Sequence, residues 1–204
     1  MKIEQLNYPY IAILRGIKSN EVAEHAKILY QQGFRAIEVP LNSPDPFTSI
    51  QSLLTTYKKD CLIGAGTVTK VEEVEQLAQL GANLVVTPNT NIDVIKTAKA
   101  NGLLVAAGFT TITEGFAAIE AGADVLKLFP AGNLGLSYLG AIKSVLPKNI
   151  PIFAVGGIEP DNINAFLEAG CAGAGLGSAL YKANQASEKT QANAVSFVQA
   201  HQKV

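Results

Sequence analysis

The sequence predicts a closed (β/α)8 barrel, and three observations lead to that prediction. Short apolar and β-branched segments recur along the whole chain, with helical segments between them. There are eight such segments, the strand number of this barrel, and a chain of 204 residues lies at the short end of its range of ~200 to 400 residues. A glycine follows five of the helical segments, directly before the next apolar run. We therefore expect residues 1–204 to form one domain.

The elements follow one another as strand, loop, helix, glycine and strand. Glycine accepts the left-handed backbone conformation in which helices commonly end, so each of these glycines marks a return to a strand. They are Gly33, Gly81, Gly102, Gly122 and Gly170. The expected strands span residues 10–14, 36–41, 62–67, 84–87, 103–107, 125–129, 152–155 and 172–176.

The starts of several helices are marked as well. Thr69 with Glu72, and Thr111 with Glu114, have the spacing of a capping box, in which the side chains of both residues satisfy free backbone N–H groups. Pro160 is suited to a first helical turn, where its missing N–H does no harm.

The alanine-rich end, residues 186–204, predicts a final helix. The alternative architecture is a doubly wound open sheet. That fold would need a glycine-rich fingerprint after the first strand, where this sequence reads Leu14-Arg15-Gly16 instead. The barrel is therefore the favoured prediction.

The composition favours a compact protein that binds a small molecule. The chain is 48% hydrophobic and 16% charged, and its net charge is −1. Its positive and negative residues are interspersed, whereas a nucleic-acid binder has a basic patch. Cys61 and Cys171 lie in apolar segments, as buried thiols of a reducing compartment do. We find neither a leader pattern nor an apolar run long enough for a membrane span. We expect a cytoplasmic protein without membrane or nucleic-acid partners.

Lys127 lies in the middle of an apolar strand, where burying an ammonium group costs free energy unless it is paired or loses its proton. Because side chains alternate across a barrel strand, Lys127 and Glu38 should both point into the interior. A desolvated lysine can lose its proton near neutral pH and add to a carbonyl group, and a nearby carboxylate can move the protons. This pair predicts Schiff-base carbon chemistry. The alternative is a buried ion pair without a chemical role.

The last two strands lead into glycine-rich loops. Loops in these positions of a barrel commonly bind a phosphate through backbone N–H groups, so we expect a phosphorylated substrate. The alternative is that these glycines only permit tight turns. The loops read Gly156-Gly157-Ile158 and Gly175-Leu176-Gly177-Ser178, and the Ser178 hydroxyl group is expected to donate a hydrogen bond to the anion.

Two further residues at strand ends are candidates for substrate binding. Arg15 is expected to bind an anion, with a surface ion pair as the alternative. Thr67 offers a hydroxyl group to the same pocket; the alternative is that it only stabilises the turn in which it lies. No cluster of His, Cys, Asp and Glu has metal-ligand spacing, so we expect no metal. His25 and His201 are given no role.

At these residues the sequence resembles the class I keto-deoxy-phosphosugar-acid aldolases, and the resemblance covers essentially the whole chain. The motif G-x(3)-L-K-L-F-P-A-x(3)-G runs from Gly122 to Gly135 and implies that Lys127 is the Schiff-base lysine. The motif around Glu38 implies that this residue transfers protons. The resemblance also implies that Arg15 and Thr67 bind the pyruvyl carboxylate. No cofactor is expected, and family members are commonly homotrimers.

The sequence departs from the gluconate-type members of that family at two places. E-V-P-L-N stands at residues 38–42 instead of E-V-T-L-R, and Val155 replaces the threonine before the two glycines. These differences resemble the galactonate branch, whose substrate differs at the C4 hydroxyl; losing a hydroxyl at Val155 can change which epimer is bound. Gluconate or dual specificity is the alternative. An isomerase or epimerase, and a noncatalytic sugar-phosphate-binding barrel, are further alternatives.

Overall fold

The computed structural model describes Ile3 and residues 6–201, and it confirms the predicted barrel. Eight parallel strands pair with their neighbours in chain order, and β1 pairs with β8 to close the barrel. Their bounds differ from the predicted ones by at most two residues. They are β1 (Tyr10–Ile13), β2 (Ala36–Pro40), β3 (Leu62–Gly66), β4 (Leu84–Val86), β5 (Leu104–Phe109), β6 (Val125–Leu128), β7 (Ile152–Val155) and β8 (Gly173–Leu176).

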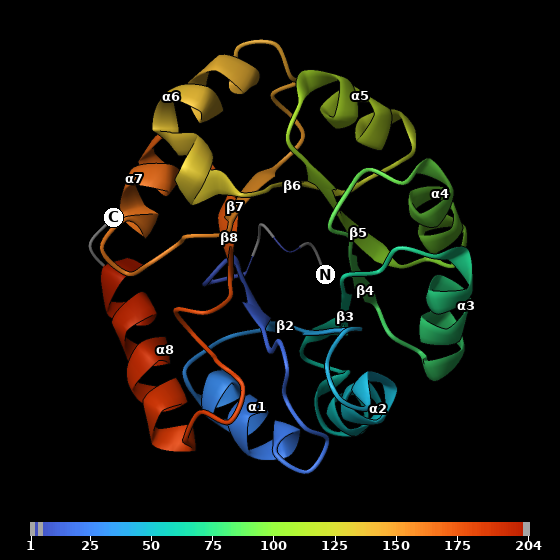
Figure 1. Ribbon diagram of the computed structural model, residues 1–204, viewed down its shortest axis with the longest axis vertical. Helices are drawn as coiled ribbons and strands as arrows, with labels where there is room; N and C mark the ends of the chain where they lie inside the picture. The colour runs from blue at the N-terminus through green and yellow to red at the C-terminus, as the bar shows by residue number, and fades with distance from the viewer. Residues whose placement is uncertain (1–2, 4–5, 202–204) are drawn as a thin grey trace.

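A helix follows each strand, and the helices form a ring around the strands (Figure 1). The final helix was predicted to reach Val204; residues 202–204 of that prediction lie outside the described residues. The helices are α1 (Val22–Gln31), α2 (Pro46–Tyr57), α3 (Val71–Leu80), α4 (Ile92–Ala100), α5 (Ile112–Glu120), α6 (Ala131–Lys143), α7 (Ile163–Glu168) and α8 (Ser187–His201).

The alternation of side chains along the strands separates two hydrophobic layers. In β6, Leu126 and Leu128 pack in the outer layer between strands and helices, whereas Val125 packs in the layer inside the barrel. In β2, Ile37 and Val39 likewise belong to the outer layer. The odd positions of β6 and the even positions of β2 therefore face the interior, as the sequence predicted.

All five predicted helix ends and one predicted helix start are confirmed. All five helix-ending glycines have positive φ, between 74° and 94° for four of them and 99° for Gly122. Thr111 and Glu114 form the predicted capping box at α5. The five glycines and the box at Thr111 therefore mark true helix boundaries.

Two of the predicted helix starts are wrong. The box at Thr69 and Glu72 does not form, because α3 begins one residue later than predicted. Glu73 then occupies the third helical position, and its carboxylate accepts the N–H groups of Thr69 and Lys70 at 2.8 and 3.1 Å. Pro160 lies in a turn that precedes α7, not in its first helical turn.

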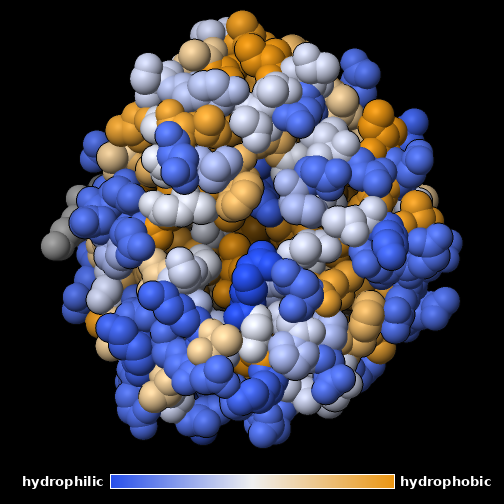
Figure 2. All heavy atoms as spheres, viewed as in Figure 1, coloured by the Kyte–Doolittle hydropathy of each residue, from blue (hydrophilic) through white to orange (hydrophobic). Residues whose placement is uncertain are grey.

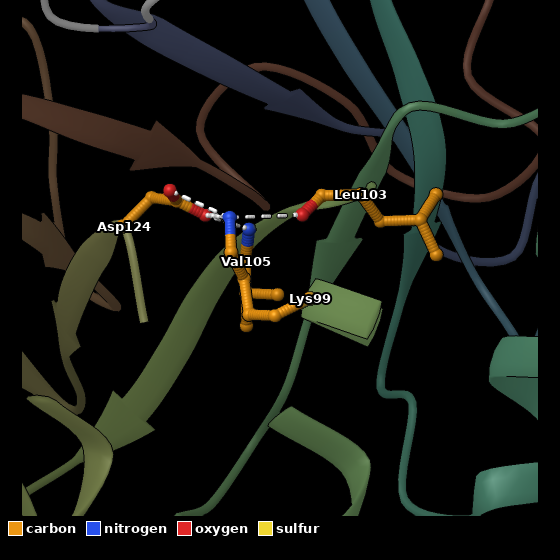
Figure 3. Close-up of polar contacts among 4 residues, drawn as sticks. All are labelled: Lys99, Leu103, Val105 and Asp124. Carbon is orange, nitrogen blue, oxygen red and sulfur yellow. Dashed lines mark hydrogen bonds and ion pairs between the residues drawn. The ribbon is translucent and has the colours of Figure 1, made fainter. Parts of the chain in front are cut away.

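At the end where the strands begin, polar side chains complete the hydrogen bonding of the sheet. The Asp124 carboxylate accepts the Val105 N–H at 2.8 Å and the Lys99 ammonium at 2.6 and 2.8 Å (Figure 3). Lys99 also donates to the Leu103 carbonyl at 3.2 Å. This cluster links α4 to β5 and β6 at the amino-terminal end of the strands, which is the opposite end of the barrel from the carboxyl ends of the strands.

Cys61 and Cys171 are buried and free, as predicted. None of the helices within residues 6–201 combines the length and the apolar character that a membrane crossing requires.

Candidate active site

A cavity of about 700 Å³ opens at the ends of the strands, and all nine sequence-predicted site residues line it. In the view of Figure 2, a hollow lies over the centre of the barrel, with hydrophilic side chains at its rim and hydrophobic ones deeper inside. The predicted residues that line the cavity are Arg15, Glu38, Thr67, Lys127, Val155, Gly156, Gly157, Gly177 and Ser178.

Lys127 reaches this cavity from β6 and is 9% exposed. Its Nζ donates a hydrogen bond to the Thr87 carbonyl at 2.9 Å and lies 5.4 Å from the centre of the Phe129 ring. Burial lowers the pKa of Lys127 and the Arg15 charge lowers it further, while the Glu38 carboxylate opposes both effects. The site therefore favours the neutral, nucleophilic amine more than water does.

Glu38 reaches the cavity from β2 and is 2% exposed. Burial raises the pKa of Glu38 to about 7, although Lys127, Arg15 and the Gly66 N–H each lower it. Within the described residues, its Oε2 has no hydrogen-bond partner. A side chain at Gly66 would overlap the Glu38 carboxyl group, so the absence of a Cβ there makes room for the acid.

Lys127 and Glu38 face one cavity without an ion pair shorter than 4.0 Å between them. The alternative of a closed, purely structural ion pair is therefore not what the structure shows. An amine with a lowered pKa can attack a carbonyl carbon, and an acid with a pKa near 7 can both donate and accept protons at neutral pH. The arrangement is suited to forming and hydrolysing an imine.

Arg15 follows β1, and its partners are neutral side chains. Its Nη1 donates to the Asn42 Oδ1 at 2.7 Å, and its Nη2 donates to the Thr67 Oγ1 at 3.4 Å. These bonds orient the guanidinium group without neutralising its charge, so it can still bind an anion. The alternative of a surface ion pair for Arg15 is wrong in this structure, because its described partners carry no charge.

Thr67 has a φ of 56°, which is rare for a β-branched residue. Such backbone strain gathers at functional sites, where the surrounding structure holds it in place. Here it turns the Thr67 hydroxyl group toward Arg15 at the cavity wall.

The two glycine-rich loops follow β7 and β8, and both line the cavity. Gly156 and Gly157 have φ values of 89° and 71°, which side chains would disfavour. The Gly132 N–H, at the start of α6, donates to the Gly156 carbonyl at 2.8 Å. After β8, the N–H groups of Leu180 and Tyr181 bond to the Gly177 carbonyl, which closes a helical turn. Turns of this kind present free N–H groups to an anion.

The cavity lining has an excess of positive charge. Arg15, Lys127 and Lys182 line it with Glu38 as the one acid among the described lining residues. An anionic ligand is therefore favoured. In the part of the chain that the structure describes, no three His, Cys, Asp or Glu side chains gather closely enough to hold a metal ion.

Among the residues of the site that the sequence does not predict, three carry a charge or bind a predicted site residue. In the sequence Asn42 stands out only as a departure from a family motif, although it binds Arg15. Lys182 lines the cavity beside the last glycine loop, and its place five residues after Gly177 was the available signal. The sequence indicates for Thr87 only the end of a strand, although its carbonyl accepts the Lys127 hydrogen bond.

Comparison with known proteins gives a consistent result. Residues 4–196 match the family described as KDPG and KHG aldolase. The chain is 48% identical over 197 residues to the 2-dehydro-3-deoxy-6-phosphogalactonate aldolase of Escherichia coli K12, covering 97% of this chain and 96% of that protein. It is 43% identical over 196 residues, or 96% of this chain and 92% of the relative, to a Rhizobium meliloti protein named "Probable 2-dehydro-3-deoxy-6-phosphogalactonate aldolase". A solved structure titled "Native KDPGal structure" superposes with a TM-score of 0.96 at 48% identity, covering 98% of this chain and 97% of that chain.

Proposed function

Because the chain belongs to the KDPG and KHG aldolase family, we propose that it is a class I aldolase of 2-dehydro-3-deoxy-6-phosphogalactonate. The products are pyruvate and D-glyceraldehyde 3-phosphate, and residues 1–204 act as one aldolase domain. The observation that carries the proposal is the pair of Lys127 and Glu38 in one cavity with an excess of positive charge. The names of the two relatives at 48% and 43% identity support the choice of the galactonate substrate.

The reaction begins with the Lys127 amine, which attacks the C2 ketone of the substrate. Loss of water from the resulting carbinolamine gives a protonated imine, with Glu38 moving the protons. When the C4 hydroxyl gives its proton to the Glu38 carboxylate, the C3–C4 bond breaks and its electron pair moves toward the imine nitrogen. Glyceraldehyde 3-phosphate leaves, and an enamine of pyruvate stays on Lys127.

The remaining steps return the enzyme to its starting state. A proton adds to C3 of the enamine, and water hydrolyses the imine to release pyruvate from Lys127. The iminium group is the electron sink of the reaction, so the mechanism needs no cofactor.

The substrate spans the cavity between its two anionic ends. Arg15 and Thr67 bind the carboxylate, because the guanidinium group is held in place but not neutralised. The phosphate binds at the two glycine-rich loops, at Gly156, Gly157, Gly177 and Ser178. Val155, at the end of β7, lines the same cavity, and the proposed binding mode brings the C4 hydroxyl beside it.

Borohydride reduction in the presence of pyruvate tests the chemistry. It should attach the three-carbon unit irreversibly to Lys127, which mass spectrometry of the peptides would detect. A Lys127→Met variant, which keeps a long unbranched side chain but has no amine, is the matched control. An unlabelled Lys127 in the wild-type protein would refute the mechanism.

Parallel rate measurements on the galactonate and gluconate substrates test the specificity. The wild-type protein should prefer the galactonate epimer, and Val155→Thr should move the ratio of kcat/KM values toward gluconate. Exchanging a methyl group for a hydroxyl in an apolar pocket changes discrimination by on the order of 100-fold. A wild-type preference for gluconate would overturn the choice of substrate, and binding without pyruvate release would favour a noncatalytic role.

We further propose that the protein is a cytoplasmic homotrimer. Three consecutive helices carry exposed apolar side chains, which a subunit interface would cover. Sedimentation equilibrium should give three times the monomer mass of 21.5 kDa, and a monomer would refute the assembly. The exposed apolar residues are Ile92 in α4, Ile112 and Phe116 in α5, and Leu136 in α6.

A further inference from the structure

The parallel ladder between β4 and β5 changes its hydrogen bonding at Thr87, directly after β4. The Thr87 N–H donates to the Ala106 carbonyl at 3.0 Å, as a parallel ladder requires. In such a ladder the carbonyl of the same residue accepts the N–H two residues further along the partner strand, which is Gly108. Here the Gly108 N–H donates instead to the Thr87 hydroxyl, at 3.0 Å.

This exchange of acceptors leaves the Thr87 carbonyl available to another donor. That donor is the Lys127 Nζ, at 2.9 Å in a buried contact. Gly108 is also the register partner of Lys127 across β5 and β6, so all three residues lie at one level of the barrel. The position of the lysine is therefore linked to the side chain of Thr87 through the backbone of the sheet.

The Thr87 hydroxyl is fixed in this role by its own surroundings. Thr87 is fully buried, and its Oγ1 donates to the Asn89 carbonyl at 2.6 Å while it accepts from Gly108. A Cβ at Gly108 would overlap the Pro88 carbonyl group, so the turn after β4 packs directly on this glycine. The Thr87 hydroxyl group is thus held by one donor and one acceptor.

We propose that Thr87 is a positioning residue for the reaction: its hydroxyl replaces its own carbonyl in the sheet, and the freed carbonyl holds the Lys127 amine toward the substrate. This inference rests on the proposed function of Lys127. A lysine side chain has four rotatable bonds, and one fixed acceptor at its Nζ selects the orientations that reach the cavity.

Removing the hydroxyl should undo this arrangement. In Thr87→Val the buried Gly108 N–H needs a new acceptor, and the nearest one in a parallel ladder is the Thr87 carbonyl. That carbonyl would turn back into the sheet and away from Lys127. The charged groups that face Lys127, Glu38 and Arg15, are left unchanged by the substitution.

The test measures single-turnover imine formation with pyruvate, quenched into borohydride, across a range of pH. Thr87→Val should slow imine formation by about tenfold or more. The ascending limb of its pH profile should move to lower pH, because the ammonium form loses its acceptor. Thr87→Ser keeps the hydroxyl and should stay within about twofold of the wild-type rate, with an unshifted limb. If Thr87→Val does not fold, Thr87→Ala lacks the same hydroxyl and needs no extra room.

Thr90→Val is the matched control. Thr90 lies in the same turn, and its hydroxyl donates to the carbonyl of the same glycine, Gly108, at 2.8 Å, without a contact to Lys127. It should lose stability but keep the wild-type pH profile. A Thr87→Val protein whose pH profile matches that of Thr90→Val would overturn the inference. Wild-type protein that is not labelled at Lys127 would refute the proposed function as well, so the two failures are distinguishable.

Discussion

Gly66→Ala tests whether the space beside Glu38 is needed for catalysis. Gly66 is a strand residue of β3, and its φ lies outside the range that side chains avoid, so alanine fits the backbone there. The added Cβ would instead overlap both oxygens and the carboxyl carbon of Glu38. The carboxyl group would have to move by at least about 1 Å to restore an ordinary separation of about 3.5 Å between heavy atoms.

The size of the effect follows from that displacement. Moving a catalytic group by about 1 Å costs on the order of 100-fold in rate, which corresponds to about 2.7 kcal/mol in the activation barrier. Overpacking the interior costs a further ~1 to 3 kcal/mol in the free energy of unfolding. For a chain of this length, this loss lowers Tm by about 2 to 12 °C.

The assay couples pyruvate release to its reduction by a dehydrogenase, at a temperature well below the Tm of the variant. kcat should fall about 100-fold, and circular dichroism should show that the barrel remains folded. Labelling of Lys127 by borohydride and pyruvate should be slower than in the wild type. A folded Gly66→Ala protein with wild-type kcat would show that the position of the Glu38 carboxyl group does not matter for turnover.

Three further substitutions test other features of the structure. Glu38→Gln should gain stability relative to the wild type as pH rises from 4.5 to about 7. Because the pKa of Glu38 is raised, the folded protein holds the Glu38 proton more tightly than the unfolded chain does. The stability that this proton contributes is present below pH 4.5 and is lost as pH rises through about 7. Urea unfolding at both pH values measures the difference, and a constant difference would contradict it. Asp124→Ala should lower the free energy of unfolding by about 1 to 2 kcal/mol, because the Val105 N–H and Lys99 lose a partly exposed acceptor. The same substitution should leave kcat unchanged. Calorimetry measures the change in stability, and a rate assay measures kcat. Gly140→Ala should add about 0.5 to 1 kcal/mol of stability, since nothing lies within 4 Å of an added Cβ in α6, and a loss in urea unfolding would contradict this.

The parts of the fold that depend on short-range patterns could be predicted from the sequence. The two-residue period of the strands predicted that Lys127 and Glu38 face the interior, and the glycines predicted where helices end. The capping box before α3 was predicted one residue too early, because Glu72 and Glu73 are both available to such a box. The choice between them depends on the packing of Val74 and Leu77 against the core, which no local motif contains.

The supporting contacts of the site could not be predicted in the same way. Asn42 binds Arg15 from 27 residues away, and Thr87 binds Lys127 from 40 residues away. The contact at Thr87 also involves a backbone carbonyl, which every residue carries, so residue type gives no signal for it. Only the closure of the barrel brings these groups together.

The Lys99–Asp124 cluster lies at the end of the barrel where β5 and β6 begin, away from the candidate active site. Protein engineers therefore have two separate regions to work on in one small scaffold. Heat tolerance can be sought among the first residues of the strands, while substrate range is altered at the loops that follow their last residues. Libraries confined to either region should combine with little interference, since distant changes usually add in their effects.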